Sequence, residues 1–185
     1  MIITTSDRPW RVLADPCLEQ AALAKGGEQL REKRAVACDE ATAPEVLEVL
    51  GRDDEELVRI AVAWNVSTPG RQLLVMTVDP SVEVRRGVAN NPSTTPQLLT
   101  VLAFDERADV RWVVACRPDA PARALAFLAR DEEPFVRRAV AVHRTTALET
   151  LAELEGDEAV RGALEWRGSK AWADVGAYQA AGYGG

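Results

Sequence analysis

The sequence predicts an all-α solenoid, a stack of small helical repeats, because one spacing runs through most of its 185 residues. An aspartate and a basic residue each recur at intervals of 26 residues. The two columns are Asp53, Asp79, Asp105, Asp131 and Asp157, and Lys33, Arg59, Arg85, Arg111 and Arg137. Such a period is typical of repeat proteins whose units pack on their neighbours. The aromatic content of only 5%, with abundant Ala, Val and Leu, favours short, closely packed helices over sheets.

The first helix of each repeat is predicted around the basic residue, which we number position 0. Val recurs at positions −1 and +3 and Ala at +4, a spacing that gathers apolar side chains on one helical face. We expect each aspartate of the column to open this helix. Asp79-Pro80 is an aspartate followed by proline, and Asp53 with Glu56 has the spacing of a capping box.

The second helix of each repeat is predicted from leucines at positions +14 and +17, which are one helical turn apart. A proline precedes them: Pro44, Pro69, Pro96 and Pro121. We expect each proline to be the first helical residue, after a polar cap such as Thr68 or Thr95. Helices of about eight to eleven residues are marginal alone, so stacking must supply their stability.

The sequence predicts one solenoid domain over 1–185, with an N-terminal cap or half-repeat at 1–31, about five repeats at 32–167 and a C-terminal capping helix and tail at 168–185. Within the caps we expect a half-repeat over 16–25 and a closing helix over 169–180. Arg161 comes two residues early in the 26-residue frame, so the last junction should be irregular. Glu32 and Glu165 replace Val and Ala in the outermost repeats, as expected of end caps.

Residues 84–92, followed by Thr95-Pro96 and by Asp105, resemble the repeat of the leucine-rich repeat variant family. That resemblance covers about residues 32–167 and implies a right-handed superhelix of alternating α- and 3₁₀-helices without strands. We therefore expect a right-handed α-solenoid of two-helix repeats, either α/α or α/3₁₀. Some members of the family hold a four-iron–four-sulfur cluster through N-terminal cysteines. Only Cys17 and Cys38 lie near the N-terminus here, so that cofactor is not expected.

The aspartate and basic columns also resemble HEAT repeats, in which an Asp and an Arg six residues later form a ladder between neighbouring units. We therefore predict a structural ladder rather than a phosphate-binding stripe. Its residues are Asp53, Arg59, Asp79, Arg85, Asp105, Arg111, Asp131 and Arg137.

Positions +1 and +5 vary from repeat to repeat and lie one helical turn apart on the same face. They supply the candidate partner-binding residues, which are Ile60, Trp64, Arg86, Asn90, Trp112, Arg138 and Trp166. Trp and Arg are the residues that most often anchor protein interfaces. An equally weighted alternative is that the tryptophans fill gaps between layers.

No catalytic, metal-binding or cofactor-binding constellation is found in the sequence. His143 is the sole histidine and lies at position +6, in register with Asn65 and Asn91. We expect this position to end the first helix, where Asn tolerates left-handed backbone and cations suit the helix dipole. Cys116 falls in a variable column, and no pair of cysteines has zinc-ligand spacing. The sequence therefore predicts a protein that is not an enzyme and has no cofactor.

The net charge of −7 disfavours general binding to nucleic acid or anionic membrane. Residues 1–10 lack the apolar core of a signal peptide, so we expect a cytoplasmic protein. Our first hypothesis is a scaffold that binds an unknown protein or peptide on the Trp/Arg face. The alternative is a HEAT-like nucleic-acid binding or DNA-repair protein, which the same Trp and Arg residues permit. The partner and the oligomeric state are not identified.

Overall fold

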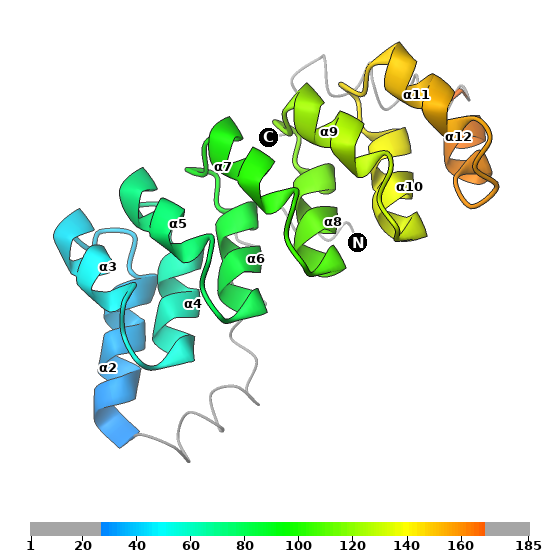
Figure 1. The fold of residues 1–185 in the computed structure, drawn as a ribbon. Coiled ribbons are helices and arrows are strands. Elements are labelled where there is room, and N and C mark those ends of the chain that lie inside the picture. The colour runs from blue at the N-terminus through cyan, green and yellow to red at the C-terminus, as the bar shows by residue number, and fades with distance from the viewer. Residues whose placement is uncertain (1–26, 169–185) are drawn as a thin grey trace, which may run out of the picture. The chain divides into compact units, whose positions relative to one another are not determined.

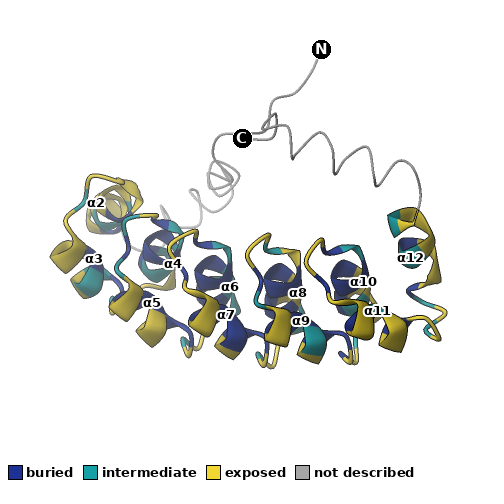
Figure 2. Ribbon diagram, turned by 90° about the horizontal axis from the view of Figure 1, so that it is seen from above, coloured by how far each residue is buried: buried dark blue, intermediate teal, exposed yellow. Residues whose placement is uncertain are grey.

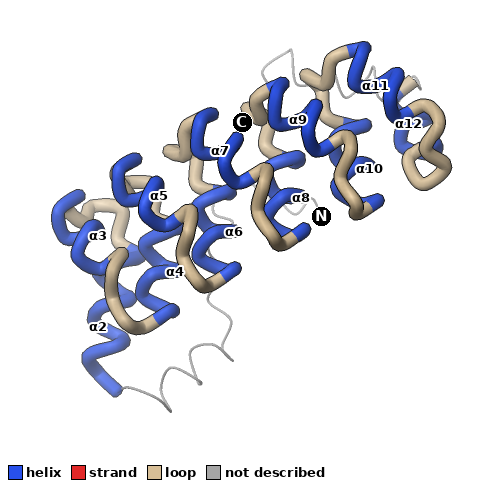
Figure 3. The backbone as a smooth tube through the Cα atoms, viewed as in Figure 1, coloured by secondary structure: helices blue, strands red, loops and turns tan. Residues whose placement is uncertain are grey.

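The structure is a computed structural model that describes residues 27–168, and over this range it contains eleven α-helices and no strand (Figures 1 and 3). The chain divides into two compact units, residues 1–93 and 94–185, which we call unit 1 and unit 2. Unit 1 holds α2 (Gly27–Cys38), α3 (Pro44–Leu50), α4 (Glu56–Trp64), α5 (Gly70–Met76) and α6 (Val82–Asn90). Unit 2 holds α7 (Pro96–Leu102), α8 (Ala108–Cys116), α9 (Ala122–Leu128), α10 (Pro134–Val142), α11 (Leu148–Leu154) and α12 (Arg161–Arg167).

Long and short helices alternate, which confirms the predicted all-α repeat solenoid. The first helices α4, α6, α8 and α10 have nine residues each, and the second helices α3, α5, α7, α9 and α11 have seven each. First helices pack on first helices, α2–α4–α6 in unit 1 and α8–α10–α12 in unit 2. Over the described residues the second helices are α-helices, so the repeat has the α/α form and not the α/3₁₀ form.

The predicted apolar columns form the core of each unit. Val at position −1 and Ala at +4 are fully buried in every repeat from α4 to α10. Figure 2 shows these first helices largely buried, while the second helices have exposed outer sides. The apolar columns are less buried at the ends of the described chain, where Val36 is 43% exposed and Leu151 is partly exposed. Two-turn helices are thus stabilised by their neighbours.

The prediction that the aspartates cap the first helices is wrong. α6 begins after Ser81, whose hydroxyl accepts a hydrogen bond from the Val84 N–H, and α4 begins after Glu55, which makes no side-chain cap. Asp79 Oδ1 instead accepts the N–H of Ser81 at 2.9 Å, two residues on. Asp53 does the same with Glu55 at 3.0 Å. Each aspartate closes a local turn before the helix, which leaves its other oxygen free for a neighbouring repeat.

The prediction that proline is the first helical residue is confirmed in two repeats. In two others the helix begins one residue after the proline. Pro44 and Pro96 lie in the first turn of α3 and α7, and the Thr95 hydroxyl caps α7 as predicted. Pro69 and Pro121 instead occupy the cap positions of α5 and α9. Thr68 therefore lies one residue before the cap of α5, and its hydroxyl donates back to the Val62 carbonyl at 2.6 Å.

The last described junction is irregular, as predicted from the early arrival of Arg161. Val160, the residue before α12, has helical backbone angles, whereas the corresponding residues before α4, α6, α8 and α10 are extended. Arg161 consequently pairs with the exposed Glu158, three residues before it. The expected half-repeat at 16–25 and closing helix at 169–180 lie outside the described residues.

Candidate functional site

The basic residue at position 0 ties two successive repeats together. In unit 1, Arg59 donates from Nε to Asp79 Oδ2 at 2.8 Å and from Nη1 to the Asp53 carbonyl at 2.8 Å. Its carboxylate partner is therefore the aspartate of the next repeat, 20 residues later. The aspartate six residues earlier supplies its backbone oxygen instead. Arg85 makes the same backbone contact, to the Asp79 carbonyl at 2.9 Å.

Unit 2 repeats this arrangement with a more buried pair. Arg111 donates to Asp131 Oδ2 at 2.6 Å and to the Asp105 carbonyl at 2.9 Å, and Arg137 contacts Asp157 and the Asp131 carbonyl in the same way. The side chains of Arg111 and Asp131 are only 8% and 2% exposed. Burial disfavours the charged Asp131 carboxylate, but hydrogen bonds from Arg111 and the Glu133 N–H outweigh it and lower its pKa. These guanidinium groups are held within the protein, which disfavours a phosphate-binding role for them.

Position +6 forms a second set of links between repeats that sequence reasoning missed. Asn65 Nδ2 donates to the Ala37 and Asp39 carbonyls at 2.8 and 2.9 Å, so it satisfies the end of the preceding first helix. Asn91 does the same for Ala63 and Asn65. The expectation of left-handed backbone here is wrong, because Asn65 and Asn91 are extended. A polar residue recurring at one position was the available signal.

His143 takes the same role in unit 2. Its Nε2 lies 2.7 Å from the Arg117 carbonyl, and its Nδ1 accepts the Thr145 N–H at 3.2 Å. The side chain is thus engaged on both ring nitrogens, and its backbone too is extended. His143 acts as a structural link between repeats.

The variable positions of unit 1 are largely used inside the protein. Trp64 lies against the next first helix, where a Cβ added to Gly87 would come within 3.0 Å of two atoms of the indole ring. Ile60 is partly buried. Arg86 pairs with Glu83 at 2.7 Å, and Asn90 donates to the Arg86 carbonyl at 3.1 Å. In unit 1 the gap-filling interpretation of Trp64 therefore fits the structure.

The variable positions of unit 2 are more open. Trp112 on α8 and Trp166 on α12 are each 44% exposed, and the exposed Arg138 lies on α10, the helix that packs between these two. Arg138 Nη2 donates to the Ala159 carbonyl at 3.1 Å. We call Trp112, Arg138 and Trp166 the Trp–Arg–Trp face. Three successive first helices thus present two indoles and a guanidinium.

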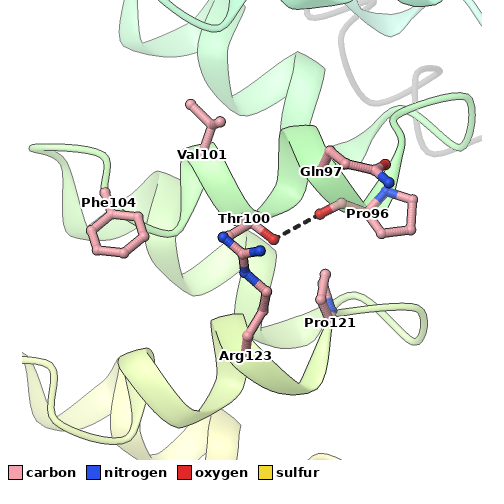
Figure 4. A pocket seen from close by; sticks show the side chains of 7 residues that line it. All are labelled: Pro96, Gln97, Thr100, Val101, Phe104, Pro121 and Arg123. Atoms are coloured by element: carbon pink, nitrogen blue, oxygen red, sulfur yellow. Dashed lines mark hydrogen bonds between the residues drawn. The ribbon is translucent and has the colours of Figure 1, made fainter.

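The second helices carry exposed apolar side chains that sequence reasoning also missed. Leu74, Val75 and Val78 are 48–79% exposed in unit 1, and Val101, Phe104 and Phe127 are 43–60% exposed in unit 2. The signal was the recurrence of large apolar residues at positions +16 and +19, outside the buried columns. In unit 2, Val101 and Phe104 line a shallow cleft between α7 and α9 (Figure 4).

The described residues offer no group of three or more His, Cys, Asp or Glu side chains that could hold a metal ion. Burial of its sulfur raises the pKa of Cys116, although the residue as a whole is exposed, so little of its thiol is reactive thiolate near neutral pH. Among helices in the described range, none has the length and apolar character needed to cross a bilayer.

No protein-family model matches the chain, and no curated protein matches it. One similar solved structure is described as a leucine-rich repeat variant with a novel repetitive protein structural motif. The match has 27% sequence identity, covers 85% of this chain and 79% of that chain, and has a TM-score of 0.39. At that TM-score the superposition carries no argument about function. The match agrees with the resemblance to leucine-rich repeat variants that the repeat sequence shows.

Proposed function

We propose that this chain is a non-catalytic scaffold that binds a protein or peptide on the Trp–Arg–Trp face of unit 2. Helical repeat folds are in general scaffolds for protein interaction, and each layer adds one strip of surface. Trp and Arg are the side chains that contribute most per residue at protein interfaces. The spacing of one first helix per layer suits an extended or helical partner segment that touches successive repeats.

The contrast between Trp64 and Trp112 is the observation that carries this proposal. Both occupy variable positions, yet Trp64 is packed against Gly87 while Trp112 leaves 44% of its surface exposed. Most apolar residues of the first helices are buried, so an exposed indole on a first helix indicates a contact surface. Covering Trp112 and Trp166 with an apolar partner side chain would remove that surface from water.

Arg138 defines the polar chemistry of the partner. A guanidinium has five N–H donors, and the hydrogen bond of Arg138 to the Ala159 carbonyl uses Nη2 alone. A partner with an apolar anchor flanked by a carboxylate or a backbone carbonyl would satisfy both parts of the face.

The test is capture of partner proteins from native extract by the full chain, compared quantitatively with Trp112→Ala/Trp166→Ala. Leu74→Ala is the control, because Leu74 is a 54% exposed apolar residue on a second helix of unit 1, outside the Trp–Arg–Trp face and the cleft between α7 and α9. We expect specific partners to be lost with the double variant and kept with the control. Partners that bind the double variant as well as the wild type would refute this assignment.

Nucleic-acid binding remains the alternative hypothesis, and nothing in the geometry favours it. The net charge is −7, and Arg59, Arg111 and Arg137 are engaged in ion pairs with aspartates within the protein. Binding of duplex or single-stranded DNA at low salt, lost steeply as salt is added, would favour this alternative over the protein partner.

A further inference from the structure

A cleft of about 490 Å³ lies between α7 and α9 in unit 2, on the second-helix side and apart from the Trp–Arg–Trp face. Figure 4 shows Gln97, Thr100, Val101 and Phe104 on the α7 side, with Pro121 and Arg123 on the α9 side. The lining contains no acidic residue, and neither α7 nor α9 contains one. In a chain with net charge −7, this is a locally basic and apolar surface.

One end of the cleft is an apolar ledge. Phe104 and Phe127 are 60% and 43% exposed, and their ring centroids lie 3.9 Å apart with the planes inclined by 37°. Val101, one turn before Phe104, is 50% exposed. The two rings form a surface wide enough to receive an aromatic or large aliphatic side chain, which would be removed from water on contact.

Arg123 contributes the charged group of the cleft, a guanidinium. The equivalent arginine of unit 1 indicates which group should face it. Arg71 occupies the same repeat position in unit 1 and forms an ion pair with Glu48 of the preceding repeat. In the cleft, the position of Glu48 is taken by Thr100, whose hydroxyl donates to the Pro96 carbonyl at 2.9 Å. Arg123 is exposed, and no hydrogen bond or ion pair to another residue of the described range satisfies it. The cleft therefore contains an arginine at the repeat position that forms an inter-repeat ion pair in unit 1, but it lacks the carboxylate partner.

We propose that this cleft binds an acidic protein segment whose carboxylate takes the place that Glu48 fills in unit 1. A neighbouring aromatic or large aliphatic side chain of the same segment packs on Phe104 and Phe127. Charge complementarity selects the carboxylate, because Arg–carboxylate pairs are charge-assisted and geometrically specific. This is a second binding surface, independent of the one proposed above, and it would let one chain hold two segments at once.

The experiment is a selection of random linear peptides displayed on phage against the immobilised full chain, followed by anisotropy titration of the enriched peptides. We expect enriched peptides to pair Asp or Glu with a nearby aromatic or large aliphatic residue. Loss of a charge-assisted hydrogen bond predicts that Arg123→Ala weakens their binding about tenfold or more. Arg71→Ala is the matched control and should leave binding unchanged, because it removes an arginine from the same column that already has its carboxylate.

Thr100→Glu is the decisive variant, since it supplies the missing carboxylate within the chain and should block the peptides. Thr100→Gln adds nearly the same volume without the charge and should leave most binding intact. Thermal unfolding verifies that the variants fold. Peptides without an acidic residue, equal binding to wild type and Arg123→Ala, or equal loss with Thr100→Gln and Thr100→Glu would overturn the proposal. Peptide binding should also survive Trp112→Ala/Trp166→Ala, which separates this site from the Trp–Arg–Trp face.

Discussion

The first-helix faces of the two units occupy the same repeat positions and use them differently. In unit 1, Trp64 is packed against Gly87, and Arg86 and Asn90 make contacts within their own helix. In unit 2, Trp112 and Trp166 remain 44% exposed on either side of α10. The constant positions of the repeat thus have the same role in both units. The variable positions differ, because they pack inside unit 1 and form an open surface in unit 2.

Repeat position and a small neighbour both distinguish Trp64. Trp64 is at position +5 and Trp112 at position +1, and the repeat after Trp64 has Gly87 at position +2. Without a Cβ, Gly87 leaves room for the indole to approach the neighbouring helix. The packing of Trp64 therefore depends on a residue 23 places further on, outside its own helix.

The largest loss of stability is expected from removing the buried ion pair between Arg111 and Asp131 in unit 2. Arg111→Ala should lower the free energy of unfolding by about 3 kcal/mol or more, because it leaves the buried Asp131 carboxylate without its partner. Arg130→Ala removes an exposed pair with Glu153 in the same unit and should cost less than about 1 kcal/mol. Chemical denaturation measures both variants. Equal costs would show that burial of the Arg111 pair does not matter.

Acid unfolding provides a check on the same pair. The folded pKa of Asp131 lies below that of an unfolded aspartate, near 3.9, so the unfolded state takes up its proton first as pH falls. The stabilisation is therefore complete well above about pH 4 and is lost below it. Arg111→Ala should reduce this dependence on pH.

Closing the space under Trp64 should be the next largest effect. A Cβ at position 87 would lie 2.8 Å from the Ala63 Cβ and 3.0 Å from the indole, so Gly87→Ala should destabilise the protein by about 1–3 kcal/mol. Ala139→Val tests the same repeat position in unit 2, where the residue already carries a Cβ. Thermal unfolding of the two variants compares the faces. A Gly87→Ala protein that melts with the wild type would mean that the indole is not confined there.

A smaller change in stability is expected when a core residue of unit 1 is replaced by the residue found at the same repeat position in unit 2. Gln72 is 1% exposed, and its amide nitrogen and oxygen have no hydrogen-bond partner in the described part of the chain, whereas unit 2 has Leu98 at this repeat position. Gln72→Leu should therefore stabilise the protein by about 1 kcal/mol. Denaturant midpoints measure the gain, and a destabilised Gln72→Leu would indicate that the amide has a partner in solution.

The repeat period was sufficient to predict the helices and the core, because a residue kept at one position in every layer meets the same neighbours each time. It did not predict the partner of the arginines. In sequence, Asp53 stands six residues before Arg59, yet Asp53 contributes only its carbonyl, since its carboxylate faces the preceding repeat and pairs with Lys33. The register between layers is a three-dimensional property that the period alone leaves open.

The candidate site was predictable only as a set of positions. Trp64 occupies position +5 and Trp112 position +1, and the period did not indicate which of these variable residues would pack against the next layer. Phe104 and Arg123 lie outside the first-helix positions from which the candidate residues were predicted. The sequence alone does not show that a carboxylate is missing at Thr100. This follows from the structure, in which Arg71 pairs with Glu48 at the equivalent positions of unit 1.

The central claim is that Trp64 belongs to the packing and Trp112 to an open surface, and the most direct test is the stability of the two alanine variants measured side by side. Trp64→Ala should lower the free energy of unfolding by about 2 kcal/mol, because it empties the space against Gly87. Trp112→Ala should change it by less than about 0.5 kcal/mol, as expected of an exposed side chain. Equal losses in the two variants, or a larger loss for Trp112→Ala, would contradict the account.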